Sequence, residues 1–205
     1  MTQTLTQDKL ILASSSPRRR DLLQEAGVDF HVIPPAVDEP ADLSCALKPT
    51  HVAEALAYFK ARAVSDEWRR NLVLGADTIV ALGDEIMGKP IDADDARRML
   101  QDLSRNRHEV ITGVAIILAG RLRLIASDTT HVTMRPMSEQ EIEQYIDSGE
   151  WEGKAGAYAI QETADRFVVK LEGSFSNVVG LPVELVDRML RQVRSDLAPD
   201  RGDEA

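Results

Sequence analysis

The sequence predicts an α/β protein whose mixed β-sheet contains a long antiparallel hairpin. Short apolar runs of strand length alternate with segments of helical periodicity over residues 10–103, which is typical of α/β folds. Two longer runs rich in β-branched and aliphatic residues, 110–118 and 122–132, are separated by a short turn, and this spacing indicates the hairpin. A length of 205 residues fits a single domain with a buried core.

Local signals divide the first half of the chain into elements. A strand at 10–13 precedes Pro17, which suits the first turn of a helix that should run to Ala26, and Gly27 is a natural helix stop. The elements expected next are a strand at 30–33, a helix capped by Thr50, a strand at 72–74, a turn at 75–77, a strand at 78–82 that turns back at Gly83, and a helix from Asp92 to about Leu103.

The second half continues after the hairpin with mixed elements. Ser138 and Glu141 have the spacing of a capping box and should begin a helix through Ile146. We then expect a glycine-containing loop at 149–156, short strands at 158–161 and 167–172, and a last amphipathic helix from Pro182 to about Val193. These elements should form one domain over residues 9–194, with flexible polar termini at 1–8 and 195–205.

The charge and composition of the chain restrict its partners. The 24 Lys and Arg residues are outnumbered by 34 Asp and Glu residues, so the formal net charge of −10 disfavours binding of nucleic acid through the overall field. The single cysteine, Cys45, cannot form an internal disulfide. No apolar run approaches the ~20 residues of a membrane helix, and the first residues are too weakly apolar for a secretory signal. We therefore expect a cytoplasmic protein that binds neither membranes nor nucleic acid.

Serines and arginines cluster where the first strand should meet the first helix. In segment 14–20, three serines precede Pro17 and three arginines. Hydroxyl groups, free backbone N–H groups at a helix start and guanidinium groups together favour a bound anion. The alternative is a capped helix with a solvated basic first turn, although arginines are unfavourable near the positive end of a helix.

Other charged residues are candidates for the same site. Asp77 interrupts an apolar stretch, where a carboxylate must be paired, hydrogen-bonded or bound to a metal, unless it simply forms a turn. Glu39 follows a double proline and could join Asp77 around a hard cation, or it could be solvated. Lys60 lies on a largely apolar helix, and glycines beside Lys89 and Lys154 allow backbone and ammonium to approach one phosphate. Each lysine alone is more often a surface charge, and it is their joint appearance with the serine and arginine cluster that favours a shared site.

Five motifs in order resemble the Maf family of nucleoside triphosphate pyrophosphatases over about residues 10–190. They are LILASSSPRR at 10–19, GADTIV at 75–80, GKP at 88–90, GKAGAYAIQ at 153–161 and SNVVGLP at 176–182. The resemblance implies an inosine-triphosphatase-like (Maf/Ham1) architecture with two lobes around a cleft, usually as a homodimer. It also implies a house-cleaning hydrolase that releases pyrophosphate from a nucleoside triphosphate with a divalent metal cation (Mg, Mn or Co).

The resemblance further implies roles for particular residues. Asp77 is expected to act as general base or to hold the metal, which Glu39 shares. The residues expected to hold phosphate oxygens are Ser14, Arg19, Lys60, Lys89 and Lys154. Arg18, Thr78 and Gln161 match the three positions that divide the family and look like the branch acting on dTTP and UTP; modified pyrimidine nucleotides are also conceivable substrates. One departure is Arg105, where the family usually has glycine.

Two alternatives remain at the level of sequence. The first is a pyrophosphatase for 7-methyl-GTP or another non-canonical nucleotide, a branch that typically carries Trp, Gln and Glu at the three dividing positions. The second is a non-enzymatic regulator of cell division that binds a protein partner. A Lys89→Ala variant would distinguish the second alternative from an enzyme, because a regulatory interaction should survive the loss of hydrolysis.

Overall fold

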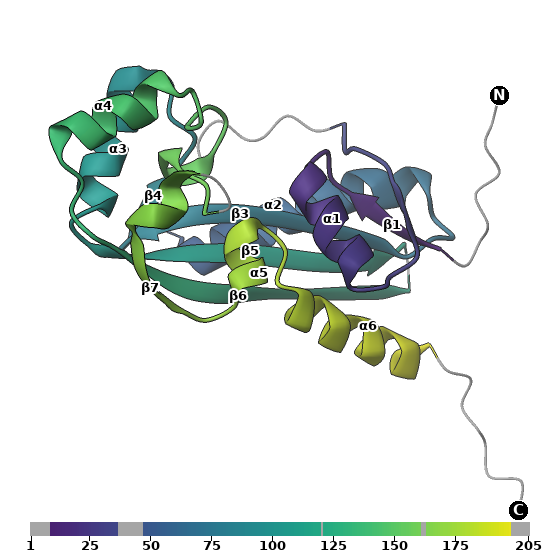
Figure 1. Cartoon of the computed structure of the whole chain (residues 1–205). Coiled ribbons are helices and arrows are strands. Elements are labelled where there is room, and N and C mark those ends of the chain that lie inside the picture. Colours follow the sequence, from purple (N-terminus) through teal and green to yellow (C-terminus); the bar gives the residue numbers. More distant parts are fainter. Residues whose placement is uncertain (1–8, 37–46, 120, 161–162, 198–205) are drawn as a thin grey trace, which may run out of the picture.

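The computed structural model describes residues 9–36, 47–119, 121–160 and 163–197 of the chain (Figure 1). Within these ranges, seven strands form one sheet in the order β2, β1, β3, β5, β6, β7, and β4 pairs with β3 outside this path. The strands are β1 (Leu10–Ala13), β2 (Phe30–Val32), β3 (Val73–Leu82), β4 (Glu85–Met87), β5 (Arg107–Leu118), β6 (Leu122–Met134) and β7 (Val168–Glu172). β1 is parallel to β2 and β3, and the other pairs are antiparallel.

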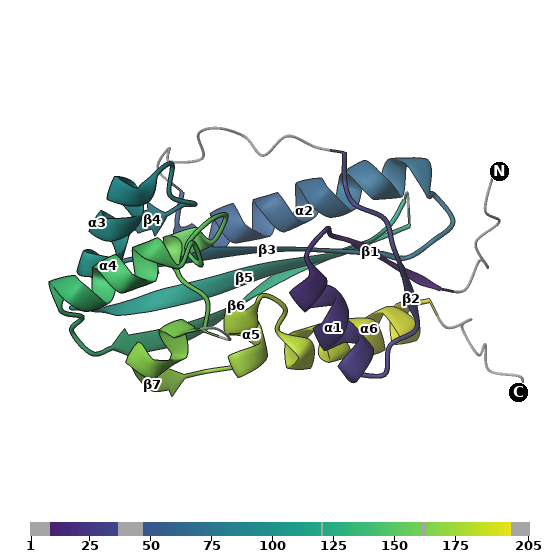
Figure 2. The same ribbon diagram turned by 45° about the horizontal axis from the view of Figure 1, so that its top comes forward.

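Helices cover both faces of the sheet. They are α1 (Pro17–Glu25), α2 (Pro49–Glu67), α3 (Ala93–Leu103), α4 (Glu139–Asp147), α5 (Phe175–Val179) and α6 (Val183–Asp196), with 3₁₀ turns η1 (Ala155–Ala157) and η2 (Thr163–Phe167). Figure 2 shows α2 along one face of the long strands and α1, α5 and α6 on the opposite side. No helix in the described ranges has both the length and the apolar character needed to cross a membrane.

The predicted fold class and most predicted elements are confirmed. The long hairpin is the β5–β6 pair, whose register runs from Arg107 opposite Thr133 to Leu118 opposite Leu122. Asp92 caps α3 through its carboxylate, which accepts a hydrogen bond from the Asp95 N–H at 2.8 Å. The capping box of Ser138 and Glu141 is present at the start of α4.

Three local predictions are wrong. Residues 75–77 are not a turn, because β3 is one continuous strand across them. Thr50 does not cap α2, because the helix already begins at Pro49, whose missing N–H costs nothing at the first helical position. Lys48 occupies the N-cap position, and its side chain makes no capping bond. Residues 158–160 form no strand, because this segment turns its side chains into the interior and toward a cavity instead of pairing with the sheet.

Small residues explain the continuity of β3. Gly75 is buried against α2, and a Cβ there would lie only 2.5 Å from the carbonyl oxygen of Ala57. Gly113 on β5 meets the same helix, and a Cβ there would collide with the backbone of Ala53. The two glycines therefore let α2 lie directly on β3 and β5, and Gly75 serves this contact instead of a turn.

One edge of β3 is interrupted. β1 pairs with residues 73–75 of β3, and β4 pairs with residues 80–82. β5 occupies the other edge from residue 73 to residue 81. Because a strand has only two edges, residues 76–79 have no strand partner on the first edge among the described elements. We refer to residues 76–79 as the open segment of β3.

The core divides along the long strands. One apolar cluster gathers around α3, α4 and the adjoining ends of β3, β5 and β6, and includes Tyr145 and Phe167. Another gathers around β1, α1 and α6, and includes Leu23 and Leu181. Figure 1 shows these two groups of helices at opposite ends of the long strands.

Candidate active site

A cavity of about 870 Å³ lies beside the open segment of β3. It is lined by residues from both ends of the molecule, including α1, α2, the segment after β4 and the segment around η1. Eight of the residues predicted for the site line it: Ser14, Arg18, Arg19, Lys60, Asp77, Thr78, Lys89 and Lys154. Glu39 and Gln161, the other two predicted residues, lie outside the described residues, so their predicted roles stay predictions.

Asp77 and Lys60 form an ion pair at this cavity. The Lys60 ammonium contacts the Asp77 carboxylate, and both side chains are largely buried, with 13% and 11% of their surface exposed. Lys60 comes from α2 and Asp77 from β3, so the close approach at Gly75 and Gly113 sets the position of the pair. A buried carboxylate without such a partner would be costly, and the pairing fixes its orientation toward the cavity.

Arg19 connects α1 to the open segment of β3. Its guanidinium donates to the carbonyl oxygens of Gly180 and Ala76, both at 2.8 Å, and to the Thr78 hydroxyl at 3.1 Å. The Ala76 carbonyl belongs to the edge that no strand covers, so Arg19 takes the place of a strand partner there. These contacts place the arginine at the cavity, and its charge also acts on whatever binds there.

A chain of hydroxyl groups continues from Arg19 into the interior. The Thr78 and Thr112 oxygens are 2.9 Å apart, and Thr112 donates to the backbone carbonyl of Asn177 at 3.1 Å. Because a hydroxyl has one proton, Thr112 must accept from Thr78, which in turn accepts from Arg19. Asn177 is fully buried and donates to the Val110 carbonyl at 2.9 Å. Thr112 and Asn177 were not predicted as site-supporting residues, although Asn177 stands in the SNVVGLP motif.

The strand alternation explains how one segment reaches both faces. Adjacent residues of a strand point to opposite sides of the sheet. Asp77 meets Lys60 on the face covered by α2, and Thr78 accepts from Arg19 on the other face, where the Gly180 carbonyl oxygen lies 3.3 Å from the Thr78 hydroxyl oxygen. Both still line the cavity, because the missing strand partner opens the sheet at this point.

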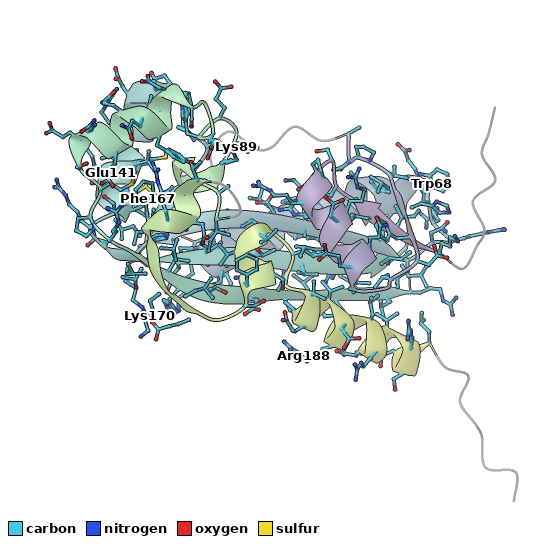
Figure 3. All side chains as sticks on the ribbon, viewed as in Figure 1. Trp68, Lys89, Glu141, Phe167, Lys170 and Arg188 are labelled. Atoms are coloured by element: carbon cyan, nitrogen blue, oxygen red, sulfur yellow. The ribbon has the colours of Figure 1, made fainter. Side chains whose placement is uncertain are left out.

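The two lysine-bearing loops lie next to each other. The N–H of Gly156 donates to the carbonyl of Gly88 at 3.0 Å, which joins the segments that carry Lys89 and Lys154. Lys154 contacts the backbone carbonyl of Glu150. Figure 3 labels Lys89 at the edge of the α3–α4 end of the molecule, on the side toward α1. Both lysines line the same cavity as Arg19.

The start of α1 offers further donors. Ser16 is the N-cap residue of α1, but its side chain makes no capping bond, and Ser14 accepts a hydrogen bond from the Ser16 N–H at 3.2 Å. A helix start in this state favours a bound anion. The unused donors at this helix start agree with an anion site. The alternative interpretation, a solvated basic first turn, fits Arg20, which pairs with Asp21 on the surface.

An apolar wall completes the cavity. Val52, Leu56, Ile79 and Ile86 line it together with the buried ring of Tyr158. These side chains provide a surface for a planar or apolar part of a ligand. The cavity thus combines a cationic region with an apolar one, as binding of a phosphorylated compound with a base requires.

Behind this wall, the Tyr158 hydroxyl lies 2.7 Å from Nε2 of His108. Burial lowers the pKa of His108 to about 4. Burial also raises the pKa of Tyr158. At neutral pH both groups are uncharged, so this pair supports the wall of the cavity and adds no charge to it.

The described residues contain no group of three His, Cys, Asp or Glu side chains able to hold a metal ion by themselves. Asp77 offers one hard oxygen ligand in the cavity. Mg²⁺ commonly binds one or two carboxylates and completes its coordination with substrate phosphates and water. The donor set therefore fits a divalent cation that binds together with a polyphosphate.

The fold and the cavity define an α/β protein with a cleft suited to a phosphorylated ligand. The chain belongs to the Maf family: the family model described as Maf-like protein matches residues 9–193. It is 44% identical to the dTTP/UTP pyrophosphatase of Ruminiclostridium cellulolyticum, covering 92% of this chain and 97% of that protein. It is 46% identical to the dTTP/UTP pyrophosphatase of Symbiobacterium thermophilum, covering 90% and 93%.

The architecture is also similar to a solved structure of low sequence identity. The Staphylococcus aureus Ham1 protein matches with a TM-score of 0.54 and 11% identity, covering 90% of this chain and 99% of that one. This likeness confirms the predicted inosine-triphosphatase-like (Maf/Ham1) fold class.

Proposed function

We propose that the protein is a nucleoside triphosphate pyrophosphatase that hydrolyses dTTP and UTP to the monophosphate and pyrophosphate. The observation that carries the proposal is the gathering of Asp77, Lys60, Lys89, Lys154 and Arg19 around one cavity of about 870 Å³. The relatives named dTTP/UTP pyrophosphatase, at 44% and 46% identity over most of the chain, support the choice of substrate.

In the proposed reaction, the oxygen of a water molecule bonds to the α-phosphorus while the bond to the α–β bridging oxygen breaks. The bridging oxygen leaves as part of pyrophosphate, and the attacking water gives one of its protons to a base. Asp77 either accepts this proton or holds the metal, and its contact with Lys60 keeps the carboxylate in place. Lys89 and Lys154 compensate the negative charge that develops on the leaving pyrophosphate.

A divalent cation (Mg, Mn or Co) is part of the proposal. Asp77, with Glu39 from outside the described residues, would hold it together with the triphosphate. When bound, the cation supplies positive charge to the phosphate oxygens and favours ionisation of the attacking water.

The base is assigned to the apolar wall and to the three dividing positions. Arg18 and Thr78 line the cavity, and Gln161 follows directly on Ile160, which also lines it. An amide side chain such as that of Gln161 can donate to a carbonyl and accept from an N–H on the same edge of uracil or thymine. Glutamate has no such donor at neutral pH, so the glutamine favours these pyrimidines.

The assembly and the place of action complete the proposal. We expect a homodimer, which light scattering on the purified protein would test. We also expect the protein to act in the cytoplasm on free nucleotides, with no requirement for a membrane or a nucleic acid.

The test is hydrolysis of a panel of nucleoside triphosphates with Mg²⁺ or Mn²⁺, with separate measurement of released pyrophosphate and phosphate. The proposal expects pyrophosphate as the product and the highest kcat/KM for dTTP and UTP. Preference for 7-methyl-GTP would overturn the substrate assignment. Release of single phosphates, or no hydrolysis at all, would overturn the reaction. If a Lys89→Ala variant without hydrolysis still acted on cell division, a regulatory role would replace the enzymatic one.

A further inference from the structure

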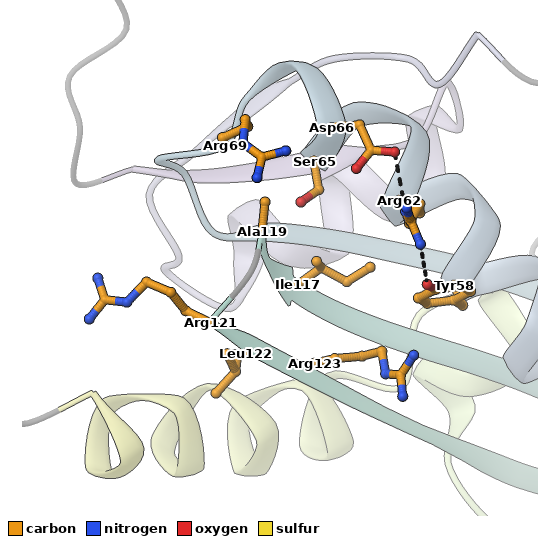
Figure 4. Close-up of a pocket in the computed structure, with 10 residues that line it drawn as sticks. All are labelled: Tyr58, Arg62, Ser65, Asp66, Arg69, Ile117, Ala119, Arg121, Leu122 and Arg123. Atoms are coloured by element: carbon orange, nitrogen blue, oxygen red, sulfur yellow. Dashed lines mark hydrogen bonds and ion pairs between the residues drawn. The ribbon is translucent and has the colours of Figure 1, made fainter.

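A second cavity of about 460 Å³ lies between the carboxyl end of α2 and the turn end of the β5–β6 hairpin (Figure 4). None of its lining residues lines the active-site cavity, so within the described residues the two are separate. α2 runs past both: Leu56 and Lys60 face the active-site cavity, and Tyr58 and Ser65 face the second one. The volume is within the range of small-molecule sites.

Positive charge is concentrated around the second cavity. Its lining contains four arginines, Arg62, Arg69, Arg121 and Arg123, and a single acidic residue, Asp66. The chain as a whole has a net charge of −10, so the charge of this cluster is opposite in sign to that of the whole chain. Clustered guanidinium groups bind phosphate and carboxylate oxygens in a bidentate manner.

Tyr58 holds two of these arginines in place. Arg62 donates to the Tyr58 hydroxyl at 3.0 Å and to Asp66 at 3.1 Å. The guanidinium carbon of Arg123 lies 5.5 Å from the centre of the Tyr58 ring, a cation–π distance. The hydrogen bond from Arg62, with a smaller contribution from Arg123, lowers the pKa of Tyr58, as expected in an electropositive site. Asp66 is therefore already engaged, while Arg69 makes no ion pair with any described residue.

Ser65 provides an independent observation. It is 1% exposed, and its hydroxyl has no hydrogen-bond partner among the described residues. Figure 4 shows its side chain pointing from α2 toward Ala119 at the end of β5. A buried hydroxyl without a partner is unfavourable unless something satisfies it. A ligand with an oxygen acceptor in this cavity would do so.

We propose that the second cavity is a binding site for a small phosphorylated ligand of the size of a nucleoside monophosphate. The arginines around the cavity bind its phosphate, and the Ser65 hydroxyl donates to one of its oxygens. Ile117 and Leu122 form an apolar wall for the remainder of the ligand. The proposal does not depend on the reaction in the other cavity.

The test uses the metal-free protein and three probes: UMP, uridine and inorganic phosphate. NMR titration follows the backbone amide signals of Ser65 and Ala119, which report this cavity, and of Gly180, which reports the active-site cavity. We expect saturable shifts of Ser65 and Ala119 with UMP, weaker ones with phosphate, and weakest with uridine. Shifts confined to Gly180, or no saturable shift at Ser65 and Ala119, would overturn the proposal.

A double variant, Arg69→Gln with Arg123→Gln, removes two cations at exposed positions. Its matched control is Arg188→Gln with Arg194→Gln, which changes the charge equally on the exposed side of α6 (Figure 3 labels Arg188). The affinity for UMP measured at Ser65 and Ala119 should fall roughly 10- to 100-fold in the first variant and stay within about twofold in the control. An equal loss of UMP affinity in both variants would mean that the overall charge of the protein, and not this cavity, determines binding, and it would overturn the proposed site.

A Ser65→Ala variant separates a ligand-binding role from a structural one. If the Ser65 hydroxyl forms a hydrogen bond only when a ligand is bound, its removal should leave the Tm unchanged or higher, because no hydrogen bond of the free protein is lost. The same change should weaken UMP binding roughly two- to tenfold. A lower Tm with unchanged affinity would overturn the role of Ser65. Hydrolysis of dTTP by these variants should match the unaltered protein. If the unaltered protein hydrolyses no nucleotide, the proposed function fails while the binding result stands.

Discussion

Nε of Arg19 donates a hydrogen bond to the carbonyl oxygen of Gly180 at 2.8 Å, which joins α1 to the segment between α5 and α6. The same guanidinium covers the Ala76 carbonyl on the open segment of β3. Three parts of the chain that are remote in sequence therefore meet at one side chain. A sequence motif alone presents Arg19 as a phosphate ligand, whereas the structure also makes it a structural support of the cavity.

Replacement of Arg19 by Gln should destabilise the protein. The change removes charged hydrogen bonds to Gly180, Ala76 and Thr78, and we expect a loss of about 2–4 kcal/mol in the free energy of unfolding. The matched control is Arg20→Gln, because Arg20 is exposed and pairs with its neighbour Asp21. For this variant we expect a change within about 0.5 kcal/mol. Urea unfolding measures both values, and an Arg19→Gln variant as stable as the control would contradict the structural role.

The Lys60–Asp77 pair should be coupled in both activity and stability. We expect Asp77→Asn to lower kcat by roughly 10²- to 10⁴-fold, because the carboxylate is lost while the shape of the side chain is kept. Removing Lys60 as Lys60→Met leaves a largely buried carboxylate without its partner. A double-mutant cycle on the free energy of unfolding should give a coupling of about 1–3 kcal/mol.

The control for that cycle is the exposed pair of Lys9 and Asp29, whose charged atoms are 2.8 Å apart. Exposed pairs contribute little, and we expect a coupling below about 1 kcal/mol. Similar coupling energies in the two cycles would mean that the burial of Lys60 and Asp77 has no energetic consequence.

Gly113→Ala should disturb the site from a distance. The added Cβ would meet the backbone of Ala53 and Glu54 on α2, and a backbone cannot move aside as a flexible side chain can. We expect a loss of about 3 kcal/mol or more in stability, together with lower kcat because α2 carries Lys60. Thermal unfolding and steady-state kinetics measure the two effects. Unchanged Tm and kcat would show that α2 does not depend on this close approach.

The elements with strong local signals could be predicted from the sequence. Asp92 and the capping box at Ser138 depend on hydrogen bonds within one turn of helix, so a few residues contain the whole signal. The β5–β6 hairpin joins strands that are neighbours in sequence, and its β-branched runs mark both strands.

The errors fall where distant parts of the chain decide the local conformation. Gly75 looks like a turn residue, but its role is contact with α2, a helix formed by residues 49–67. Residues 158–160 have strand propensity, but the hydrogen bond between Tyr158 and His108 and the cavity wall determine their conformation. The partners in the Thr78 network are likewise remote in sequence. Thr112 lies 34 positions from Thr78, and Asn177, whose carbonyl accepts from Thr112, lies 65 positions further along the chain. Neither type of contact has a signature in a short window of sequence.

Gln161→Glu should change the base preference without weakening the triphosphate contacts. A glutamate at this position has no donor for the carbonyl of uracil or thymine, and we expect kcat/KM for dTTP and UTP to fall roughly 10- to 100-fold. Inhibition by pyrophosphate should be unchanged, because its contacts are assigned to other residues. Gln192→Glu, an equal change of charge on exposed α6, is the matched control. Equal dTTP and UTP turnover by the variant and the unaltered protein would contradict the specificity assignment.

His108 should make the stability of the protein depend on pH. Burial lowers its pKa in the folded protein to about 4, whereas in the unfolded chain it is about 6.5. The unfolded state therefore binds a proton first as the pH falls. The contribution is complete above about pH 6.5 and is lost progressively toward pH 4, with a total of about 3 kcal/mol.

The stability advantage of the unaltered protein over His108→Gln should shrink by this amount between pH 7 and pH 4, as measured by urea unfolding. A His51→Gln variant, altered at an exposed position, should follow the unaltered protein. An advantage of His108 that is independent of pH would show that folding does not change the pKa of this imidazole.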